Sequence, residues 1–341
     1  MKFYVKISII LGVVICVGYV TYKMMNPNTI EPMIFYDDKM RKMYLNYNIK
    51  IDSKNQTLTK GNKTISYATN FNPISSRMFA RNKTKSSLLM SQNNIPVCKQ
   101  VTWNNKKSDA ENVNIINREL KFPVIMKPQV GRKGINVFTD INDNSTLIKT
   151  KKILMYAKSE VQSDNIIIEE QAHGEKYRIF IVNQRIIFIK REPQPYIIGD
   201  GKQTVTELIN SFNTLHKEHP IHNINENVIK KQGYKMDGIV ENKKKITVSH
   251  VASAANGSDE IVMDISKLNM STHKMLIDVS KLLKFNICGI DYITKDLSLP
   301  YDVDGKVIEV NSSPGITENM LSKKNVATRL IDALFSPMQY K

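Results

Sequence analysis

Residues 307–316 read VIEVNSSPGI and set two polar side chains inside an apolar strand pattern. Valine and isoleucine at three of the first four positions favour a buried β-strand. Glu309 and Asn311 stand two positions apart in this run, so their side chains leave on the same face of the strand. The Ser-Ser-Pro-Gly sequence that follows predicts a turn that ends the strand. A carboxylate and an amide held side by side on a rigid strand indicate a binding site.

A second apolar run, ICGIDYI at residues 287–293, predicts a partner strand that carries Asp291. The Asp-Gly pair at 304–305 is typical of a hairpin turn, so we expect the two strands to pair antiparallel. Asp291 would then meet Glu309 and Asn311 on one face of the sheet. Three oxygen ligands without histidine or cysteine suit a hard cation such as Mg²⁺. On these residues alone, the alternative that Glu309 and Asn311 face solvent from a half-exposed strand stays open.

Upstream, a lysine and a glycine loop suggest a phosphate site. Lys127 ends the apolar strand FPVIMKP, and the following loop carries Gly131 and Gly134. The P-loop pattern GxxxxGK[ST] is absent, because here the lysine precedes the glycines. A flexible glycine loop can still close its N–H groups over phosphates, and a lysine on a strand can hold them as a point charge.

The remaining patterns predict a mixture of strands and helices with many antiparallel hairpins, hence an α+β fold. Residues 177–182 and 185–190 are expected to form paired strands across Asn183-Gln184, and IIIEE at 166–170 a strand that ends in acids. Further expectations are a hairpin over 57–67 and helices over 84–93, 203–212 and 271–283.

In this order, the motifs resemble the ATP-grasp superfamily of carboxylate–amine ligases. The resemblance is closest to the ATP-grasp module of cyanophycin synthetases and of bifunctional glutathione synthetases. It implies two α+β subdomains that clamp a nucleotide between them, within a domain at 81–341 that has a central lid subdomain at about 122–192. The matching runs are NKTKSSLLMSQNNIPV, FPVIMKPQVGRKGINV, IIIEEQAHGEKYRIFIVNQRIIFIKREPQPYIIGDGKQTVTELI, NICGIDYI and VIEVNSSPGI.

The resemblance also implies a role for each matching residue, with ordinary exposed strand residues as the alternative for Arg178 and Arg191. The nucleotide phosphates would contact a lysine and the glycine loop, with Lys83 or Lys85 as a second lysine. The implied sets are Lys127, Gly131 and Gly134 for the phosphates; Glu169, with Glu170 beside it, for ATP at the adenine; Arg178 and Arg191 for catalysis at the γ-phosphate and acyl phosphate; Asp291, Glu309 and Asn311 for two Mg²⁺ ions, with Mn²⁺ as an alternative; and Ser313 and Gly315 at the border of the substrate.

The implied activity is ATP-dependent, Mg²⁺-dependent ligation of a carboxylate to an amine through an acyl phosphate, on an amino acid or a short acidic peptide. Three departures from the family pattern bear on it. Asn136 replaces a loop glycine, Lys176 stands where the ribose-binding acid is expected, and SAANGSDEI at 253–261 replaces a Gly-Gly loop on the substrate side. An ATP-binding protein that does not turn over its nucleotide is therefore the alternative.

The N-terminus predicts a membrane anchor at residues 1–24. Residues 7–22 are uncharged and largely apolar, and lysines flank them on both sides. The run is short for a spanning helix, so a cleaved signal peptide or a buried helix stay as alternatives. Because the proposed chemistry needs ATP, we expect the catalytic domain on the cytosolic side, after a linker and small region at 25–80.

The chain has 341 residues and a formal net charge of +17. That charge would also suit a nucleic-acid-binding protein, but it gives no reason for the ordered site residues, so no nucleic-acid partner is expected. The three cysteines, Cys16, Cys98 and Cys288, lack metal-ligand spacing and indicate a reducing compartment. The oligomeric state stays open, a homo-oligomer included.

Overall fold

The computed structural model describes residues 38–68, 71–131, 134–156, 165–323, 325–337 and 340. The expected anchor, with its apolar run at 7–22, lies outside the described residues and stays a prediction. Every helix in the described part of the chain is too short or too polar to cross a bilayer.

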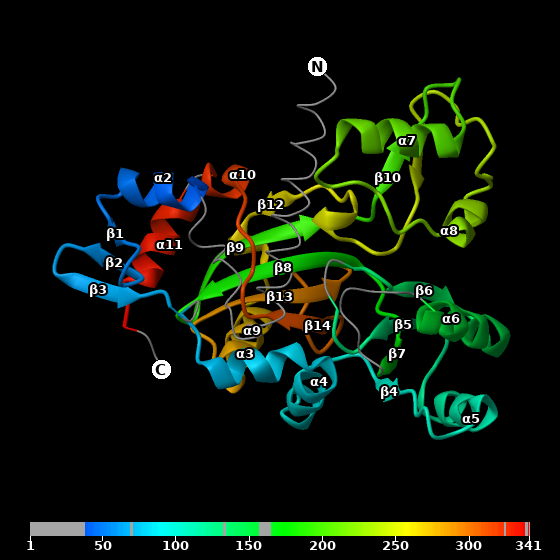
Figure 1. The fold of residues 1–341 in the computed structure, drawn as a ribbon, viewed down its shortest axis with the longest axis horizontal. Coiled ribbons are helices and arrows are strands. Elements are labelled where there is room, and N and C mark those ends of the chain that lie inside the picture. The colour runs from blue at the N-terminus through cyan, green and yellow to red at the C-terminus, as the bar shows by residue number, and fades with distance from the viewer. Residues whose placement is uncertain are drawn as a thin grey trace, which may run out of the picture.

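A five-stranded antiparallel sheet forms the centre of the molecule (Figure 1). The expected antiparallel pairing of the strands that carry Asp291 and Glu309 is confirmed, with these two residues directly opposite each other. The other edge of β13 pairs with β8, so that β13 is buried on both faces for nearly its whole length. In spatial order the strands are β12 (Ile261–Met263), β9 (Arg185–Glu192), β8 (Glu175–Val182), β13 (Ile287–Thr294) and β14 (Lys306–Asn311).

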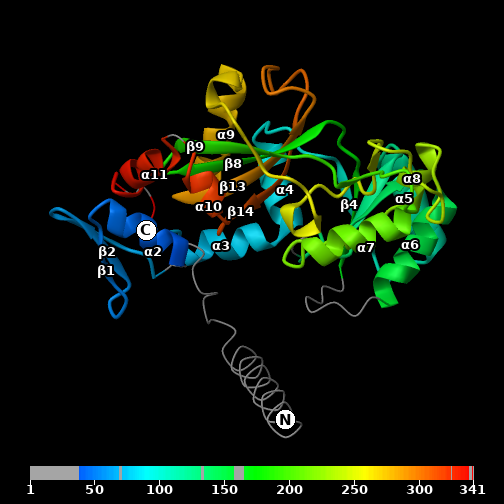
Figure 2. The same cartoon turned by 90° about the horizontal axis from the view of Figure 1, so that it is seen from above.

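Helices cover both faces of this sheet, as Figure 2 shows for α9 (Met270–Leu282) on one side and α2 (Asp38–Asn46) on the other. The apolar stripe of α9 expected from the sequence is confirmed, because Met275, Leu276 and Val279 are buried in the core on that side. On the opposite face Phe180 and Phe188 stack with ring centroids 4.9 Å apart. They share a core with α11 (Val326–Leu334), α10 (Glu318–Leu321) and α2.

A separate four-stranded sheet forms the lid, with a core of its own around Trp103, Met126 and Ile168. Its strands are β4 (Gln100–Thr102), β7 (Ile166–Glu170), β5 (Val124–Pro128) and β6 (Phe138–Ile141), and its helices are α5 (Asp109–Glu119) and α6 (Asn144–Tyr156). The expected lid extended to about residue 192, but β8 and β9 belong to the five-stranded sheet. The pairing of β8 with β13 joins residues more than 100 positions apart, which local patterns do not reveal.

A third unit sits beside the lid and was not anticipated as a unit (Figure 1). The run GDGKQTVTELI forms the turn that leads into the first helix of this unit. Asp200 stabilises the turn by accepting hydrogen bonds from the N–H groups of Lys202 and Gln203. Thr204 and Glu207 then form a capping box at the start of the helix. The elements are β10 (Tyr196–Ile198), α7 (Val205–Leu215), α8 (Glu226–Lys231), β11 (Lys245–Thr247) and η2 (Ala254–Asn256). The short helix η3 (Ile265–Lys267) contacts β9 and packs on the core of the central sheet.

The region before the lid is partly folded onto the central sheet. The predicted hairpin is confirmed and has a third strand, giving β1 (Lys50–Asp52), β2 (Thr57–Lys60) and β3 (Lys63–Ser66). The helices α3 (Ile74–Arg81) and α4 (Lys83–Gln92) follow. Between these elements, buried Asn72 donates to the carbonyls of Ile287 and Ser312 and accepts from the N–H groups of Asn286 and Ile287, which fixes the ends of β13 and β14.

Phe180→Ala is expected to lower the free energy of unfolding by about 3–5 kcal/mol, because it leaves a cavity between the central sheet and α11. Urea unfolding followed by circular dichroism measures the change. Leu215→Ala, at a side chain that is 80% exposed, is the control and should change stability by less than about 0.5 kcal/mol. Equal losses in the two variants would contradict the placement of Phe180 in the core.

Candidate active site

A cavity of about 760 Å³ lies between the lid sheet and the five-stranded sheet. Pockets of this size accommodate ligands as large as a nucleotide. Nine of the twelve site residues predicted from the sequence line it, namely Lys127, Gly131, Gly134, Glu169, Arg178, Asp291, Glu309, Asn311 and Gly315. The other three, Glu170, Arg191 and Ser313, do not.

The floor of the cavity is a row of charged side chains, one from each of four neighbouring strands. Because directly paired residues share a face, the register of the strands aligns them across the sheet. The row reads Lys190, Arg178, Asp291 and Glu309. Asn311 lies one step further along the same face, opposite Gly289. A Cβ at Gly289 would approach the Cβ of Pro314 to 2.7 Å, so a side chain there would displace the turn after β14.

Arg191, predicted as a catalytic residue, does not line the cavity, and Lys190 takes its place. The β8–β9 turn has Asn183 and Gln184 at positive φ, and pairing from this turn would put Arg191 on the face of Arg178. A bulge between Phe180 and Ile181 shifts the register by one residue and turns Lys190 to that face instead. Arg191 is opposite Tyr177 and lies 3.8 Å from Glu175. The sequence showed no signal for the bulge.

Glu170 and Ser313 are also placed differently from the expectation. Glu170 follows Glu169 in β7, so its side chain leaves on the opposite face, where it accepts a hydrogen bond of 3.0 Å from the N–H of Lys121. Ser313 is half-buried in the turn after β14 and does not line the cavity, whereas Gly315 does.

Two lysines stand on the lid side of the cavity. Lys127 is buried and donates a hydrogen bond of 2.6 Å to Glu169. Of the two candidate second lysines, Lys83 lines the cavity and Lys85 does not. Lys83 donates to the carbonyl of Gly131 at 3.1 Å and lies 3.2 Å from Glu309, so it connects the glycine loop to the metal-site strand.

The glycine loop has the backbone geometry that its sequence requires. Gly134 has a φ of 71°, and a Cβ there would lie 2.7 Å from the side chain of Val251. Asn136, at the position where the resemblance implied a loop glycine, has a φ of 58°. Asparagine tolerates this left-handed region better than most residues, so the substitution preserves the turn.

Six charged side chains form a chain of ion pairs along the cavity floor. Their signs alternate in the order Glu260, Lys190, Glu192, Lys176, Asp291 and Arg178. The Nζ of Lys176 lies 2.8 Å from Glu192 and 3.1 Å from Asp291. Arg178 donates to both oxygens of Asp291, at 2.5 and 2.9 Å. Each buried charge in this chain therefore has a neighbour of opposite sign.

These pairs keep the floor ionised. Burial would raise the pKa of Asp291, but Arg178 and Lys176 outweigh burial and lower it below its usual range. Burial would lower the pKa of Lys176, but the charges of Asp291 and Glu192 outweigh it and the pKa is raised. Both groups are consequently charged at neutral pH.

Residues 80–193 and 252–334, more than half of the chain, match the RimK-like ATP-grasp domain. The chain belongs to the RimK-like ATP-grasp family. The superfamily resemblance inferred from the sequence is confirmed, and all the charged residues of the cavity floor fall inside the matched ranges.

Curated relatives of this ATP-grasp chain are larger proteins. It is 26% identical over 235 residues to a cyanophycin synthetase from Geminocystis herdmanii, covering 63% of this chain and 26% of that protein. It is 22% identical over 276 residues to the glutathione biosynthesis bifunctional protein GshAB of Clostridium perfringens, covering 76% of this chain and 34% of that protein. The chain thus spans about a quarter to a third of the length of these relatives.

A solved structure supports the ATP-grasp fold. The bifunctional glutathione synthetase from Pasteurella multocida superposes with a TM-score of 0.51 at 19% sequence identity, covering 84% of this chain and 41% of that chain.

Of the three residues expected to hold Mg²⁺ in this ATP-grasp chain, Glu309 and Asn311 suit the ion and Asp291 does not. Glu309 keeps 31% of its side chain exposed, and Asn311 stands beside it. The amide nitrogen of Asn311 is buried without a hydrogen-bond partner among the described residues, so the amide can turn its oxygen toward a cation without losing a hydrogen bond. Asp291 does not fit in the same way, because nitrogens of Arg178 and Lys176 already contact both of its oxygens.

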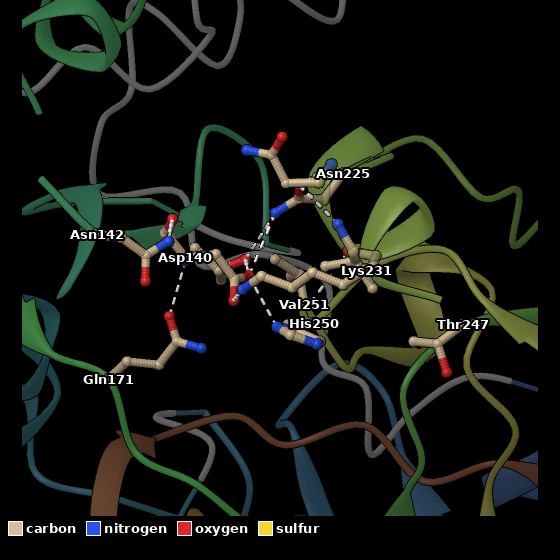
Figure 3. A network of polar contacts seen from close by, with 12 residues as sticks. Asp140, Asn142, Gln171, Asn225, Lys231, Thr247, His250 and Val251 are labelled. Carbon is tan, nitrogen blue, oxygen red and sulfur yellow. Dashed lines mark hydrogen bonds and ion pairs between the residues drawn. The ribbon is translucent and has the colours of Figure 1, made fainter. Parts of the chain in front are cut away.

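A polar network on the wall of the cavity joins the lid to the third unit (Figure 3). Asp140, at positive φ in β6, lies at its centre, with the Nδ1 of His250 2.7 Å from its carboxylate. Its N–H donates to Gln171, Asn225 donates to its side chain, and the Nζ of Lys231 lies 3.7 Å away. Because His250 lines the cavity, the network fixes part of the cavity wall.

This network predicts a pH dependence of stability. Burial would raise the pKa of Asp140, but hydrogen bonds from His250 and Thr139 outweigh burial and lower the pKa to about 2. An unfolded aspartate titrates near ~3.9, so Asp140 contributes stability above that pH and loses it as the pH falls toward 2. Asp140→Asn should therefore lose less stability than the wild type between roughly pH 5 and pH 2.5, as measured by urea unfolding.

His250→Gln is the matched variant, since it removes the first of these hydrogen bonds and keeps the carboxylate. Its pH dependence should fall between those of the wild type and Asp140→Asn. Identical pH dependences in all three proteins would contradict the role assigned to Asp140.

Proposed function

We propose that the chain is an ATP-dependent ligase that joins a carboxylate to an amine through an acyl phosphate. The observation that carries the proposal is the convergence of Lys83, Lys127 and Arg178 with Glu309 and Asn311 on one nucleotide-sized cavity between two sheets. These residues come from both sheets and from α4, in a chain whose family is shown. No protein nucleophile is needed for this chemistry, because the substrate carboxylate itself attacks the γ-phosphorus.

The chain's residues can counter the charge repulsion that opposes this attack. A carboxylate and a triphosphate repel each other, so catalysis requires neutralisation and an in-line arrangement. Lys127 and Lys83 lie near the glycine loop, where they can neutralise the phosphates. Arg178, held by two hydrogen bonds to Asp291, can stabilise charge on the transferring group without having to reorganise. Mg²⁺ bound by Glu309 and Asn311 would act as a Lewis acid on the phosphate oxygens.

Internal partners must be released for the nucleotide to bind. Among the residues that the structure describes, the cavity is lined by six lysine or arginine side chains and six carboxylates, so the charges of these side chains balance. Lys127 reaches a phosphate only by loosening its 2.6 Å bond to Glu169, which leaves that carboxylate available to a donor group of the base. An exchange of hydrogen-bond partners therefore accompanies binding in this proposal.

For substrates we propose an amino acid or a short acidic peptide as the class. The relatives named above are a cyanophycin synthetase and a glutathione biosynthesis protein, and the resemblance inferred from the sequence implies an amino acid or a short acidic peptide. The loop at 253–261 lines the cavity through Ser253, Ala254 and Ala255 and differs from the expected Gly-Gly loop. We therefore propose the chemical class of the substrate and name no individual compound.

A nucleotide-binding protein without turnover is the second candidate. It is favoured by one observation, the ion pair between Lys176 and Asp291, which engages a residue expected to bind metal. ATP binding without release of phosphate from any combination of amino acids would support this candidate over the ligase.

Glu309→Gln should lower amine-dependent phosphate release from ATP by about 100-fold or more, because it removes a charge that holds Mg²⁺ at the triphosphate. The assay uses ATP, Mg²⁺ and pooled amino acids, with mass spectrometry of the product. Glu170→Gln, the same change at a strand glutamate outside the cavity, should stay within about twofold of the wild type. Full activity of Glu309→Gln would refute the metal role of Glu309.

We also propose that residues 7–22 attach the chain to a membrane, with the ATP-grasp domain on the cytosolic side. The support is the uncharged apolar run between flanking lysines. Deletion of residues 1–24 should move the protein from the membrane pellet to the supernatant, and replacement of both Val13 and Val14 by lysine should do the same, since charges in the run oppose insertion. Retention of both variants in the pellet would contradict the anchor.

A further inference from the structure

The ammonium group of Lys176 is fully engaged by oxygens of the cavity floor. It lies 2.8 Å from Glu192 and 3.1 Å from Asp291, and it donates a hydrogen bond of 2.9 Å to the carbonyl of Ala252. The contact with Ala252 is a hydrogen bond, and the contacts with the two carboxylates are ion pairs, so the ammonium group has three oxygens within 3.1 Å. Only 16% of the side chain is exposed. Lys176 is therefore held in place by the fold rather than extended into the cavity.

Asp291 is correspondingly saturated with positive charge. Its Oδ1 accepts a hydrogen bond of 2.5 Å from Nε of Arg178. Its Oδ2 accepts one of 2.9 Å from Nη2 of Arg178 and lies 3.1 Å from Nζ of Lys176. A divalent ion on Asp291 would need an oxygen at about 2.1–2.5 Å and would come within a few ångströms of both cations. In a largely buried site such repulsion is only weakly screened.

The loop at 253–261 supports this arrangement. Its residue Glu260 forms an ion pair with Lys190, and the adjacent Ala252 accepts from Lys176. Because Lys190 has Glu260 as a second partner, Glu192 can be shared between Lys190 and Lys176. The two departures from the family pattern on this side of the cavity, at Lys176 and at this loop, thus lie in a single network of contacts.

We propose that the ammonium group of Lys176 fills the cation position beside Asp291, so that this chain holds one divalent ion, at Glu309 and Asn311, where two were expected from the sequence. The lysine is a built-in replacement for the second ion and positions Asp291 and Arg178 without metal. The inference deepens the ligase proposal and rests on it for the nucleotide complex, but its direct test needs neither nucleotide nor substrate.

The test is Mn²⁺ binding to the full chain without nucleotide, measured from the electron paramagnetic resonance signal of free Mn²⁺. Lys176→Met keeps the length of the side chain and removes its charge, which exposes Asp291 and Glu192 to the ion. This variant should gain a Mn²⁺ site that binds at least about tenfold more tightly than any site of the wild type, as expected for losing about 1.4 kcal/mol of repulsion or more. Adding Asp291→Asn should abolish the gain.

Lys190→Met is the control within the same chain of ion pairs, because it removes a more deeply buried lysine, 6% exposed, and leaves Lys176 on Asp291. Any Mn²⁺ that this variant binds should be unaffected by adding Asp291→Asn. If Lys176→Met is folded and gains no Mn²⁺ site, or if the wild type already binds Mn²⁺ tightly at Asp291, the proposal is overturned. A lysine with only a structural role would change the thermal stability without creating this site.

A double variant covers the case in which Lys176→Met does not fold. Lys176→Met with Glu192→Gln removes one charge of each sign and is compared with Glu192→Gln alone, with thermal unfolding recorded first. A Mn²⁺ site in the double variant and none in Glu192→Gln supports the proposal, and equal binding overturns it.

Native mass spectrometry with a non-hydrolysable ATP analogue and Mn²⁺ then counts the ions in the complex. One ion per nucleotide complex is expected for the wild type and two for Lys176→Met, whereas two in the wild type overturn the proposal. Failure to bind the analogue would count against the ligase function, and the nucleotide-free titration would still decide the role of Lys176.

Discussion

A carboxylate buried in an interior strand of a sheet has to be compensated by cations on the neighbouring strands, and this requirement organises the whole cavity floor. Asp291 lies in β13, where it is 4% exposed. An unpaired charge at such a position would cost several kcal/mol. Arg178 and Lys176 on β8 supply the compensating positive charge, and Glu192 on β9 is the second partner of Lys176. Lys190 in turn pairs with Glu192 and with Glu260, which ends the chain of ion pairs. Removing one member leaves its partners uncompensated, so these residues depend on one another.

The elements of the fold were largely predictable because they follow from local patterns. The strand that carries Glu309 and Asn311, its pairing with the strand of Asp291, the helix face of α9 and the hairpin around Asn183 all come from alternation, period and turn chemistry in short segments. The sheet to which β8 and β9 belong was not predictable, because hydrogen bonds between distant segments decide it.

The site shows the same division at the level of side chains. Residues placed by strand alternation alone, such as Glu309 and Asn311, face the cavity as expected. Arg191 does not, because one extra residue at the bulge in the β8–β9 ladder reverses every face beyond it. Lys176 stood out in the sequence only as a departure from a family pattern. Its contacts with Asp291 and Ala252 depend on three segments that are remote in the chain.

The equal number of basic and acidic side chains around the cavity bears on how ionic strength would affect ligand capture. The chain carries a net charge of +17, whereas the charges of the described residues that line the cavity balance. A polyphosphate that enters displaces tethered carboxylates from lysines, and few mobile counterions are released to the solvent. Release of mobile counterions is what makes the affinity of open basic surfaces fall steeply with salt. Occupancy of this cavity should consequently respond only weakly to added salt, while the rate of encounter, which the outer charges govern, responds strongly.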